Sequence, residues 1–263
     1  MTTHKHIEQL TSCYDQHAET FATTRERFRP EIDFCLQALP THTSKVPYTV
    51  ADLWCWGGRL YKYLHEHFGK KKFTYTGIDP AKSMITTAQK TYPEGLFLTG
   101  DMQTYLFHQE QESIDAIICL ASFHHLPTRA ERIRTLQYAY KALRYGGRVI
   151  LINRSYSHRF IKQYWPRFFH SFFAWITQTS WTRNDILIPR KGKSTKAPLL
   201  RYYHMFTLEE LAELAQFTGF VLYEASYITG QGELVESWEQ ARNTFVVLEK
   251  WVLVPEGADR YEE

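Results

Sequence analysis

One short turn constrains the fold of this chain more than any other segment. Residues 51–60 read Ala-Asp-Leu-Trp-Cys-Trp-Gly-Gly-Arg-Leu. The apolar run 48–53 suits a buried parallel strand, and residues 60–68 have helical spacing. A turn between such a strand and helix brings backbone N–H groups to a sheet edge, where glycine allows close approach to a ligand. An indole at position 54 or 56 would fill that space.

Strand-like and helix-like segments alternate from about residue 46 to 149, the pattern of a parallel sheet with helices on both faces. Strands are expected at 49–53, 73–79, 96–99, 114–120, 148–153, 221–228 and 243–251, the last two as an antiparallel hairpin. A helix over 129–144 should end at the two glycines that follow it, and Thr207 should cap another helix. We predict an α/β fold: a Rossmann-like, doubly wound sheet of seven strands, mostly parallel with an antiparallel C-terminal strand.

Composition excludes several classes of protein. The four cysteines form no CxxC pair, which argues against a zinc site or a disulfide framework and favours a reducing cytoplasm. The first residues lack the apolar region of a signal peptide, and we expect no membrane span. We assign no metal to the chain.

Four motifs follow one another at spacings that suit a nucleotide cofactor. The turn beginning at Asp52 is followed 27 residues later by Asp79, where an acidic side chain can accept ribose hydroxyls. Gly100-Asp101-Met102 follows the third predicted strand, and a loop with His124 and His125 follows the fourth. Any one motif could be a turn or a helix cap, but together they support the fold.

With these motifs, residues 14 to 252 resemble the class I S-adenosylmethionine-dependent methyltransferases. The resemblance implies S-adenosylmethionine as cofactor, with Asp101 and the backbone after it at the adenine. The residues that it assigns to cofactor binding are Tyr14, Arg25, Asp52, Trp54, Cys55, Trp56, Gly57, Asp79, Asp101, Met102 and Ala121.

A narrower resemblance rests on the segment 201–206, Arg-Tyr-Tyr-His-Met-Phe. It is similar to a signature of the tRNA methyltransferases that esterify a carboxymethyl group on the wobble uridine, some of which use a small zinc-binding activator protein. The catalytic candidates are His124, His125, Arg201, Tyr202 and His204, and the substrate-binding candidates are Arg154, Arg190, Lys191, Arg201 and Tyr203. The plainer interpretation is that the tyrosines pack in the core and the arginine is solvated.

The segment 154–201 is strongly basic, with ten Lys and Arg residues against the single acid Asp185, whereas the whole chain carries only +3. Aromatic residues lie between the cations, a mixture that suits RNA phosphates and splayed bases such as those of an anticodon loop. Apolar residues at helical spacing within 168–176 equally fit a helix face buried on its own domain, a lid over a small substrate or a membrane-surface helix.

We expect five segments: a helical cap (1–40), a cofactor-binding core (41–153), the basic insertion (154–201), the rest of the core (202–254) and a tail (255–263). A carboxylate acceptor is ionised at neutral pH and needs no general base, whereas a hydroxyl or a carbon acid would need one, and His124 or His125 is then the candidate.

Trp54 and Trp56 leave three interpretations of function. The chain is an active tRNA or small-molecule O- or C-methyltransferase, or a binding protein on a methyltransferase fold whose cofactor pocket is blocked. In the third, both residues are glycines in the cell, because UGA means glycine in some genetic codes and tryptophan in others. Glycine is 13 of 263 residues, below the usual share of roughly 7%.

Overall fold

The computed structural model describes residues 30–41, 47–69, 73–158, 160–167, 182–189 and 200–251. Its main sheet contains β1 (Tyr48–Leu53), β2 (Phe73–Asp79), β3 (Leu96–Thr99), β4 (Ile114–Leu120), β5 (Leu143–Arg154), β8 (Val221–Ile228), β9 (Leu234–Val235) and β10 (Asn243–Glu249). The strand order is β3-β2-β1-β4-β5-β10-β8-β9. Strands β1 to β5 are parallel, and β10 is antiparallel to both of its neighbours.

The α/β doubly wound fold and the antiparallel C-terminal strand are therefore confirmed, but the predicted count of seven strands is wrong. The short strand β9 adds an eighth to the sheet by pairing with the end of β8. The last two predicted strands do pair antiparallel, although β10 inserts between β5 and β8 and leaves β8 and β9 on the outer side.

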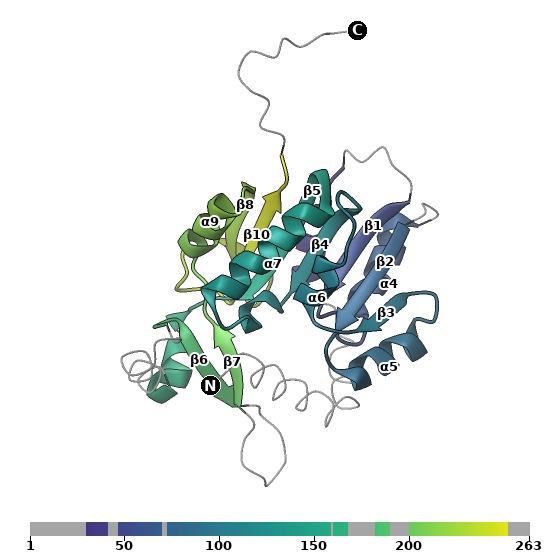
Figure 1. Cartoon of the computed structure of the whole chain (residues 1–263). Helices are drawn as coiled ribbons and strands as arrows, with labels where there is room; N and C mark the ends of the chain where they lie inside the picture. Colours follow the sequence, from purple (N-terminus) through teal and green to yellow (C-terminus); the bar gives the residue numbers. More distant parts are fainter. Residues whose placement is uncertain are drawn as a thin grey trace, which may run out of the picture.

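Helices cover both faces of the sheet (Figure 1). They are α3 (Pro30–Gln37), α4 (Arg59–Phe68), α5 (Lys82–Thr91), α6 (Met102–Phe107), α7 (Arg129–Ala142) and α9 (Leu208–Phe217), with a 3-10 turn η1 (Phe123–His125). Apolar residues of α6, α7 and α9 pack on one face, and those of α3 and α4 pack on the other. The parallel strands thus end at a single edge, which lies low in Figure 1.

Helix caps set the ends of two helices at this edge. Thr128 and Glu131 form a capping box on α7, and the Thr207 hydroxyl accepts from the N–H of Glu210 at the start of α9, as predicted. The predicted end of the first helix is wrong, because α7 stops at Ala142 and β5 begins at once. Gly146, with a φ of 75°, lies within β5 rather than capping the helix.

A separate two-stranded hairpin lies beyond the carboxyl ends of the parallel strands (Figure 1). Its strands are β6 (Asp185–Pro189) and β7 (Leu200–His204), so β7 crosses the predicted boundary at residue 201. Tyr156, Phe160 and Tyr164 of the predicted insertion pack against the apolar side of this hairpin. These three aromatic residues are half-buried, so each contributes to packing against the hairpin while part of its ring stays accessible.

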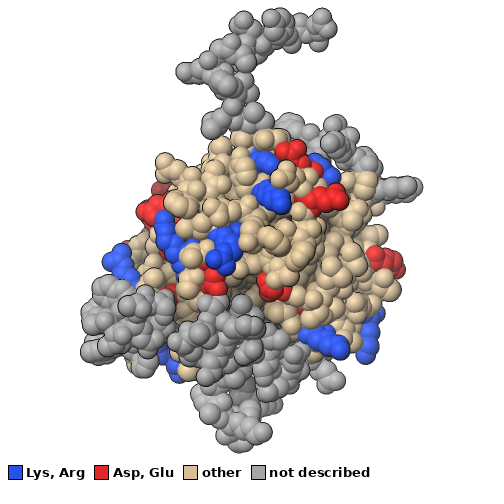
Figure 2. Space-filling view, in the orientation of Figure 1, with Lys and Arg blue, Asp and Glu red and all other residues tan. Residues whose placement is uncertain are grey.

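Charges are mixed on the face drawn in Figure 2, where basic and acidic side chains are interspersed. Among the described helices, none combines the length and the apolar composition that crossing a bilayer requires.

Candidate active site

The parallel strands bring the predicted motifs together where they end. The turn 54–58 follows β1, Asp79 ends β2, and the η1 loop follows β4. Arg154 is the last residue of β5. Crevices outside the carboxyl ends of parallel strands are the usual ligand sites of such sheets.

The two tryptophans adopt backbone conformations that favour glycine. The φ angles are 65° at Trp54 and 57° at Trp56, close to the 75° of Gly58 in the same turn. A β-carbon at Gly58 would lie 2.6 Å from the ring of Phe97, so glycine is required at this position by space as well. The turn thus keeps the shape of a glycine-rich turn while two of its residues carry indoles.

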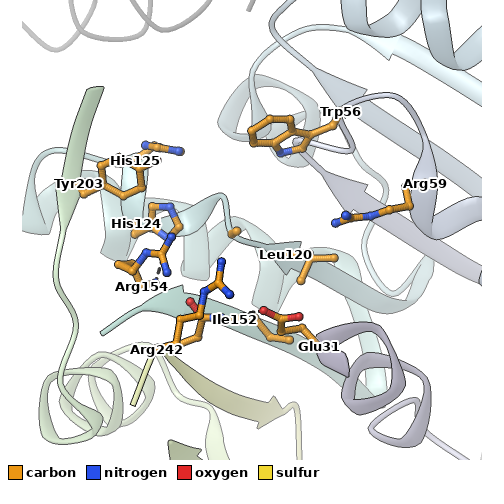
Figure 3. A pocket seen from close by; sticks show the side chains of 12 residues that line it. Glu31, Trp56, Arg59, Leu120, His124, His125, Ile152, Arg154, Tyr203 and Arg242 are labelled. Carbon is orange, nitrogen blue, oxygen red and sulfur yellow. Dashed lines mark hydrogen bonds between the residues drawn. The ribbon is translucent and has the colours of Figure 1, made fainter. Parts of the chain in front are cut away.

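The two indoles point to different places. Trp54 is 3% exposed and stacks on His125, with ring centroids 5.1 Å apart. Its indole N–H has no hydrogen-bond partner among the described residues. Trp56 is half-buried and forms part of the wall of a pocket that we call the inner pocket (Figure 3). The other residues that line it include Ala121, His124, Arg154, Tyr203 and Arg242.

Asp79 holds the turn in place through backbone N–H groups. One carboxylate oxygen accepts from the N–H of Trp56 at 3.0 Å, and the other accepts from that of Ala81 at 2.9 Å. Asp101 caps α6 by accepting from the N–H of Thr104, and Met102 behind it is buried. Each carboxylate oxygen can accept further bonds, so both groups can also receive ligand hydroxyls or amines.

Other residues of the turn serve the fold. Asp52 is buried and accepts a 2.8 Å hydrogen bond from the hydroxyl of Tyr75. Burial raises the pKa of Asp52 to about 7, although that hydrogen bond acts in the opposite direction. Cys55 is buried among the apolar residues on the face of the sheet that α3 and α4 cover. A β-carbon at Gly57 would meet only Thr87.

Both histidines of the η1 loop are buried and neutral. Nδ1 of His125 donates to the carbonyl of Tyr202 at 2.8 Å, and Nδ1 of His124 accepts from the N–H of Arg154 at 3.2 Å. Burial lowers the pKa of His125 to about 3, although its hydrogen bond acts in the opposite direction. Burial, His125 and the nearby arginines lower the pKa of His124 well below its usual value.

The alternation of β7 separates the predicted signature into two faces. Tyr203 lines the inner pocket and stacks on His124 with ring centroids 4.9 Å apart, while the guanidinium of Arg201 lies 5.4 Å from the centre of the Tyr203 ring. Tyr202 and His204 face the other way, where both are buried. Of the five predicted catalytic residues, His124 and His125 line the inner pocket, Tyr202 and His204 lie in the protein interior, and Arg201 lies beside the Tyr203 ring.

The interior residues form a charged network that fastens the hairpin to the core. His204 bonds Asp185 through Nδ1 at 2.6 Å and Glu210 through Nε2 at 2.8 Å. Burial alone would raise the pKa of both acids, but hydrogen bonds and charge from His204 lower both overall. Arg132, which is 1% exposed, donates to Glu210 and to the hydroxyl of Tyr202. Nothing in the sequence pattern indicated this role for Arg132.

Comparisons with known proteins agree with this geometry. A family profile described as a methyltransferase domain matches residues 50–147. Protein 235L of Invertebrate iridescent virus 6, named as a candidate methyltransferase, is 25% identical over 69% of this chain and 68% of its own length. The chain is an S-adenosylmethionine-dependent methyltransferase.

A further relative is the tRNA (carboxymethyluridine(34)-5-O)-methyltransferase ALKBH8 of Mus musculus, which is 29% identical over 56% of this chain. The region matched by this chain covers only 19% of the length of the mouse protein.

Two solved structures share the fold. One is a Haloferax volcanii protein in complex with the Trm112 methyltransferase activator, with a TM-score of 0.60, 15% identity and coverage of 91% of this chain and 96% of its own. The other is a Burkholderia thailandensis 1,6-didemethyltoxoflavin-N1-methyltransferase with its substrate and S-adenosylhomocysteine bound, with a TM-score of 0.61, 16% identity and coverage of 96% and 92%.

The residues at this edge fit the cofactor of a methyltransferase in chemistry. Asp79 ends β2 and Asp101 follows the neighbouring strand β3 as the N-cap of α6, and Gly58 keeps the turn close to the sheet. The inner pocket has a volume of only about 60 Å³, however, which is far below the roughly 300–1,000 Å³ of typical ligand sites. The indole of Trp56 occupies part of the missing space.

The structure also brings residues to the pocket that the sequence did not indicate. Glu31, Arg59 and Arg242 line the inner pocket together with the predicted residues (Figure 3). Arg242 could have been found, because β10 is antiparallel and its start lies at the edge where the parallel strands end. Tyr14, Arg25, Arg190 and Lys191 lie outside the described residues.

Proposed function

We propose that this methyltransferase esterifies the carboxymethyl group of a wobble uridine in tRNA, which makes it a tRNA-modifying, RNA-binding enzyme. The observation that carries the proposal is the pair of neutral histidines in a pocket lined by cations. The resemblance of residues 201–206 to the wobble-uridine signature and the similarity to mouse ALKBH8 support it.

The histidines favour an acceptor that is already a nucleophile. A general base works best with a pKa near the working pH, and the pKa of His125 is about 3. The pKa of His124 is also well below its ordinary value. A carboxylate is ionised at neutral pH and needs no base, whereas a hydroxyl or a carbon acid would have to lose a proton to one of these rings.

In this proposal Asp79 would bind the ribose of the cofactor, and Asp101 with the N–H of Met102 would bind its adenine. The turn 54–58 and Ala121 would hold its methionine portion. S-adenosylmethionine supplies a methyl group on a cationic sulfonium, so the protein mainly has to align the acceptor with it. Tyr203, held flat on His124, supplies a rigid wall for that alignment.

The test is methyl transfer from labelled S-adenosylmethionine to tRNA that carries 5-carboxymethyluridine at the wobble position. We expect label in an ester that mild alkali releases as methanol. The matched control is the same tRNA with uridine at the wobble position, because it lacks only the carboxymethyl group. Label that appears equally in the control, or that survives alkali, would rule out carboxyl esterification.

Small-molecule methylation is the second candidate, because the Burkholderia structure shows that the same fold accepts a small heterocycle. Transfer to free 5-carboxymethyluridine at a rate equal to that with tRNA would favour it.

The proposal also includes a small activator protein, since the Haloferax protein of the same fold was solved with one. Strand β3 ends the sheet and exposes Leu96 and Leu98, by 52% and 41%, so a partner could add a strand there. Copurification with a coexpressed Trm112-type protein, lost on Leu98→Lys, would support this partner.

A further inference from the structure

A second and larger cavity adjoins the inner pocket. This outer cleft has a volume of about 540 Å³ and is lined in part by Arg154, Phe160, Gln163, Tyr164, Gln231 and Arg242. Arg154 and Arg242 are the two residues that line both cavities. Both arginines therefore lie where the two cavities meet, and Figure 3 shows both side chains beside the inner pocket.

The backbone fixes this pair of arginines. Arg154 ends β5 and pairs in register with Asn243 at the start of β10, so Arg242 lies beside Ser155. The N–H of Ser155 donates to the carbonyl of Arg242 at 3.2 Å, and the N–H of Arg242 donates to that of Ile228 at 2.7 Å. Two strands that are far apart in sequence thus hold the arginines at one point.

The charges around this point favour an anion. Arg59, Arg154 and Arg242 line the inner pocket with one acid, Glu31, which already accepts a hydrogen bond from Asn243, and the outer cleft adds one more acid, Glu239. Burial is the largest cause of the low pKa of His124, and the charges of Arg154 and Arg201 lower it further, so the potential at the imidazole is positive. A carboxylate in this position would be stabilised by the same potential.

The outer cleft matches a nucleoside in size and in chemistry. Its volume lies in the range of ligand sites, and its wall combines the rings of Phe160 and Tyr164 with the amides of Gln163 and Gln231. Aromatic rings suit stacking on a base, and amides suit its hydrogen-bonding edge. The hydroxyl of Thr229 accepts hydrogen bonds from the N–H groups of Gln231 and Glu233, and these bonds order the loop on one side of the cleft.

We propose that Arg154 and Arg242 bind the carboxylate of the methyl acceptor, while its base and sugar lie in the outer cleft. This inference rests on the proposed function and names the residues that would select a carboxylate-bearing nucleoside. In the reaction a carboxylate oxygen forms a bond to the methyl carbon as the carbon–sulfur bond breaks, and its electron pair stays on sulfur. No proton moves, and the anion becomes a neutral ester.

The loss of charge has a consequence for release. The arginines attract the anionic substrate, whereas the ester product is neutral and binds them less strongly. The product therefore dissociates more readily. Because they stabilise the starting carboxylate more than the partly neutralised transition state, they contribute to binding and not to the chemical step.

The test measures affinities of the full chain for 5-carboxymethyluridine, its methyl ester and uridine by calorimetry. We expect the acid to bind about 10- to 100-fold more tightly than the ester, the range of hydrogen bonds to a charged group. Arg154→Gln and Arg242→Gln should each remove most of this preference without changing the affinity for uridine. Arg134→Gln, an exposed change in α7 away from both cavities, should keep the preference.

Equal binding of acid and ester by the unsubstituted chain, or no measurable binding of the acid, would overturn the proposal. A preference that survives in Arg242→Gln while the affinity for S-adenosylmethionine falls would overturn it too, since the arginines would then hold the carboxylate of the cofactor. A chain that prefers the acid but does not esterify carboxymethylated tRNA would instead refute the proposed function alone.

Discussion

Replacing Trp54 and Trp56 by glycine tests whether the turn is built for glycine. Both residues have φ near 60°, where a β-carbon costs roughly 1–2 kcal/mol. At ordinary positions the order is opposite, because glycine is less stable than alanine by about 0.5–1 kcal/mol. The sign of the difference between a glycine and an alanine variant therefore reports the backbone conformation, independently of the lost indole.

The magnitudes follow from burial. Trp54 is 3% exposed, and removing a buried aromatic side chain costs about 3–5 kcal/mol, so Trp54→Ala should lower the free energy of unfolding by that amount. Trp54→Gly should lower it by roughly 1 kcal/mol less. Trp56 is only half-buried, so Trp56→Gly should stay within about 1 kcal/mol of the unsubstituted chain.

Urea unfolding of the four single variants supplies the assay, with Gln137→Gly and Gln137→Ala as the control pair. Gln137 is exposed within α7, where alanine should be the more stable. Calorimetry should also show that the Trp54→Gly/Trp56→Gly double variant binds S-adenosylmethionine more tightly, because the inner pocket widens. Alanine variants that match or exceed the glycine variants at 54 and 56 would refute the reasoning.

The same geometry bears on how the chain is translated. Both tryptophans of the turn occupy left-handed positions, the conformation that a glycine at each site would adopt without strain. Peptide mass spectrometry of the protein from its native source should find glycine at both positions if UGA is decoded as glycine there. UGG codons at 54 and 56 would end this interpretation.

Three further outcomes are expected. The pKa of Asp52 is about 7 in the folded chain, whereas its ordinary value is 3.8. The free energy of unfolding should therefore fall as pH rises through that interval, by about 4 kcal/mol at 1.36 kcal/mol per pKa unit. Urea unfolding between about pH 4 and about pH 8 should show this fall, and Asp52→Asn should flatten it. The rate of methyl transfer should stay level from about pH 6 to about pH 8, since His124 and His125 remain neutral, and a steep fall near pH 6.5 would count against a carboxylate acceptor. Tyr202→Phe should destabilise the fold by about 1–3 kcal/mol and leave ligand affinity unchanged, whereas Tyr203→Ala should weaken acceptor binding in the same calorimetric assay.

Local patterns were sufficient for most of the sheet. The bounds of β2, β3, β4 and β8 were predicted without error, because each is a short apolar or β-branched run between turn residues. The end of α7 was not predicted correctly, because Gly146 has the sequence position of a helix cap. Only the pairing of β5 with β4 places Gly146 inside a strand. Strand β9 has two residues, too few for any periodicity.

The site divides in the same way. Asp79 and Asp101 could be placed from sequence because Asp79 ends β2 and Asp101 closely follows β3, two strands that the pattern predicts. The roles of the residues in 201–206 could not, because a strand sends neighbouring side chains to opposite faces, and which face meets the pocket depends on how the hairpin docks. Tyr203 turned toward His124, while Tyr202 and His204 turned toward Arg132 and Asp185.

The sequence by itself determined that the chain forms a nucleotide-binding α/β sheet of the methyltransferase type, because ordered motifs at strand ends are local features. Only the tertiary structure decided that Arg242 stands beside Arg154 and that both histidines are neutral. These properties arise from contacts between residues far apart in the chain and from the exclusion of water. A local sequence pattern predicts neither the contacts nor the burial.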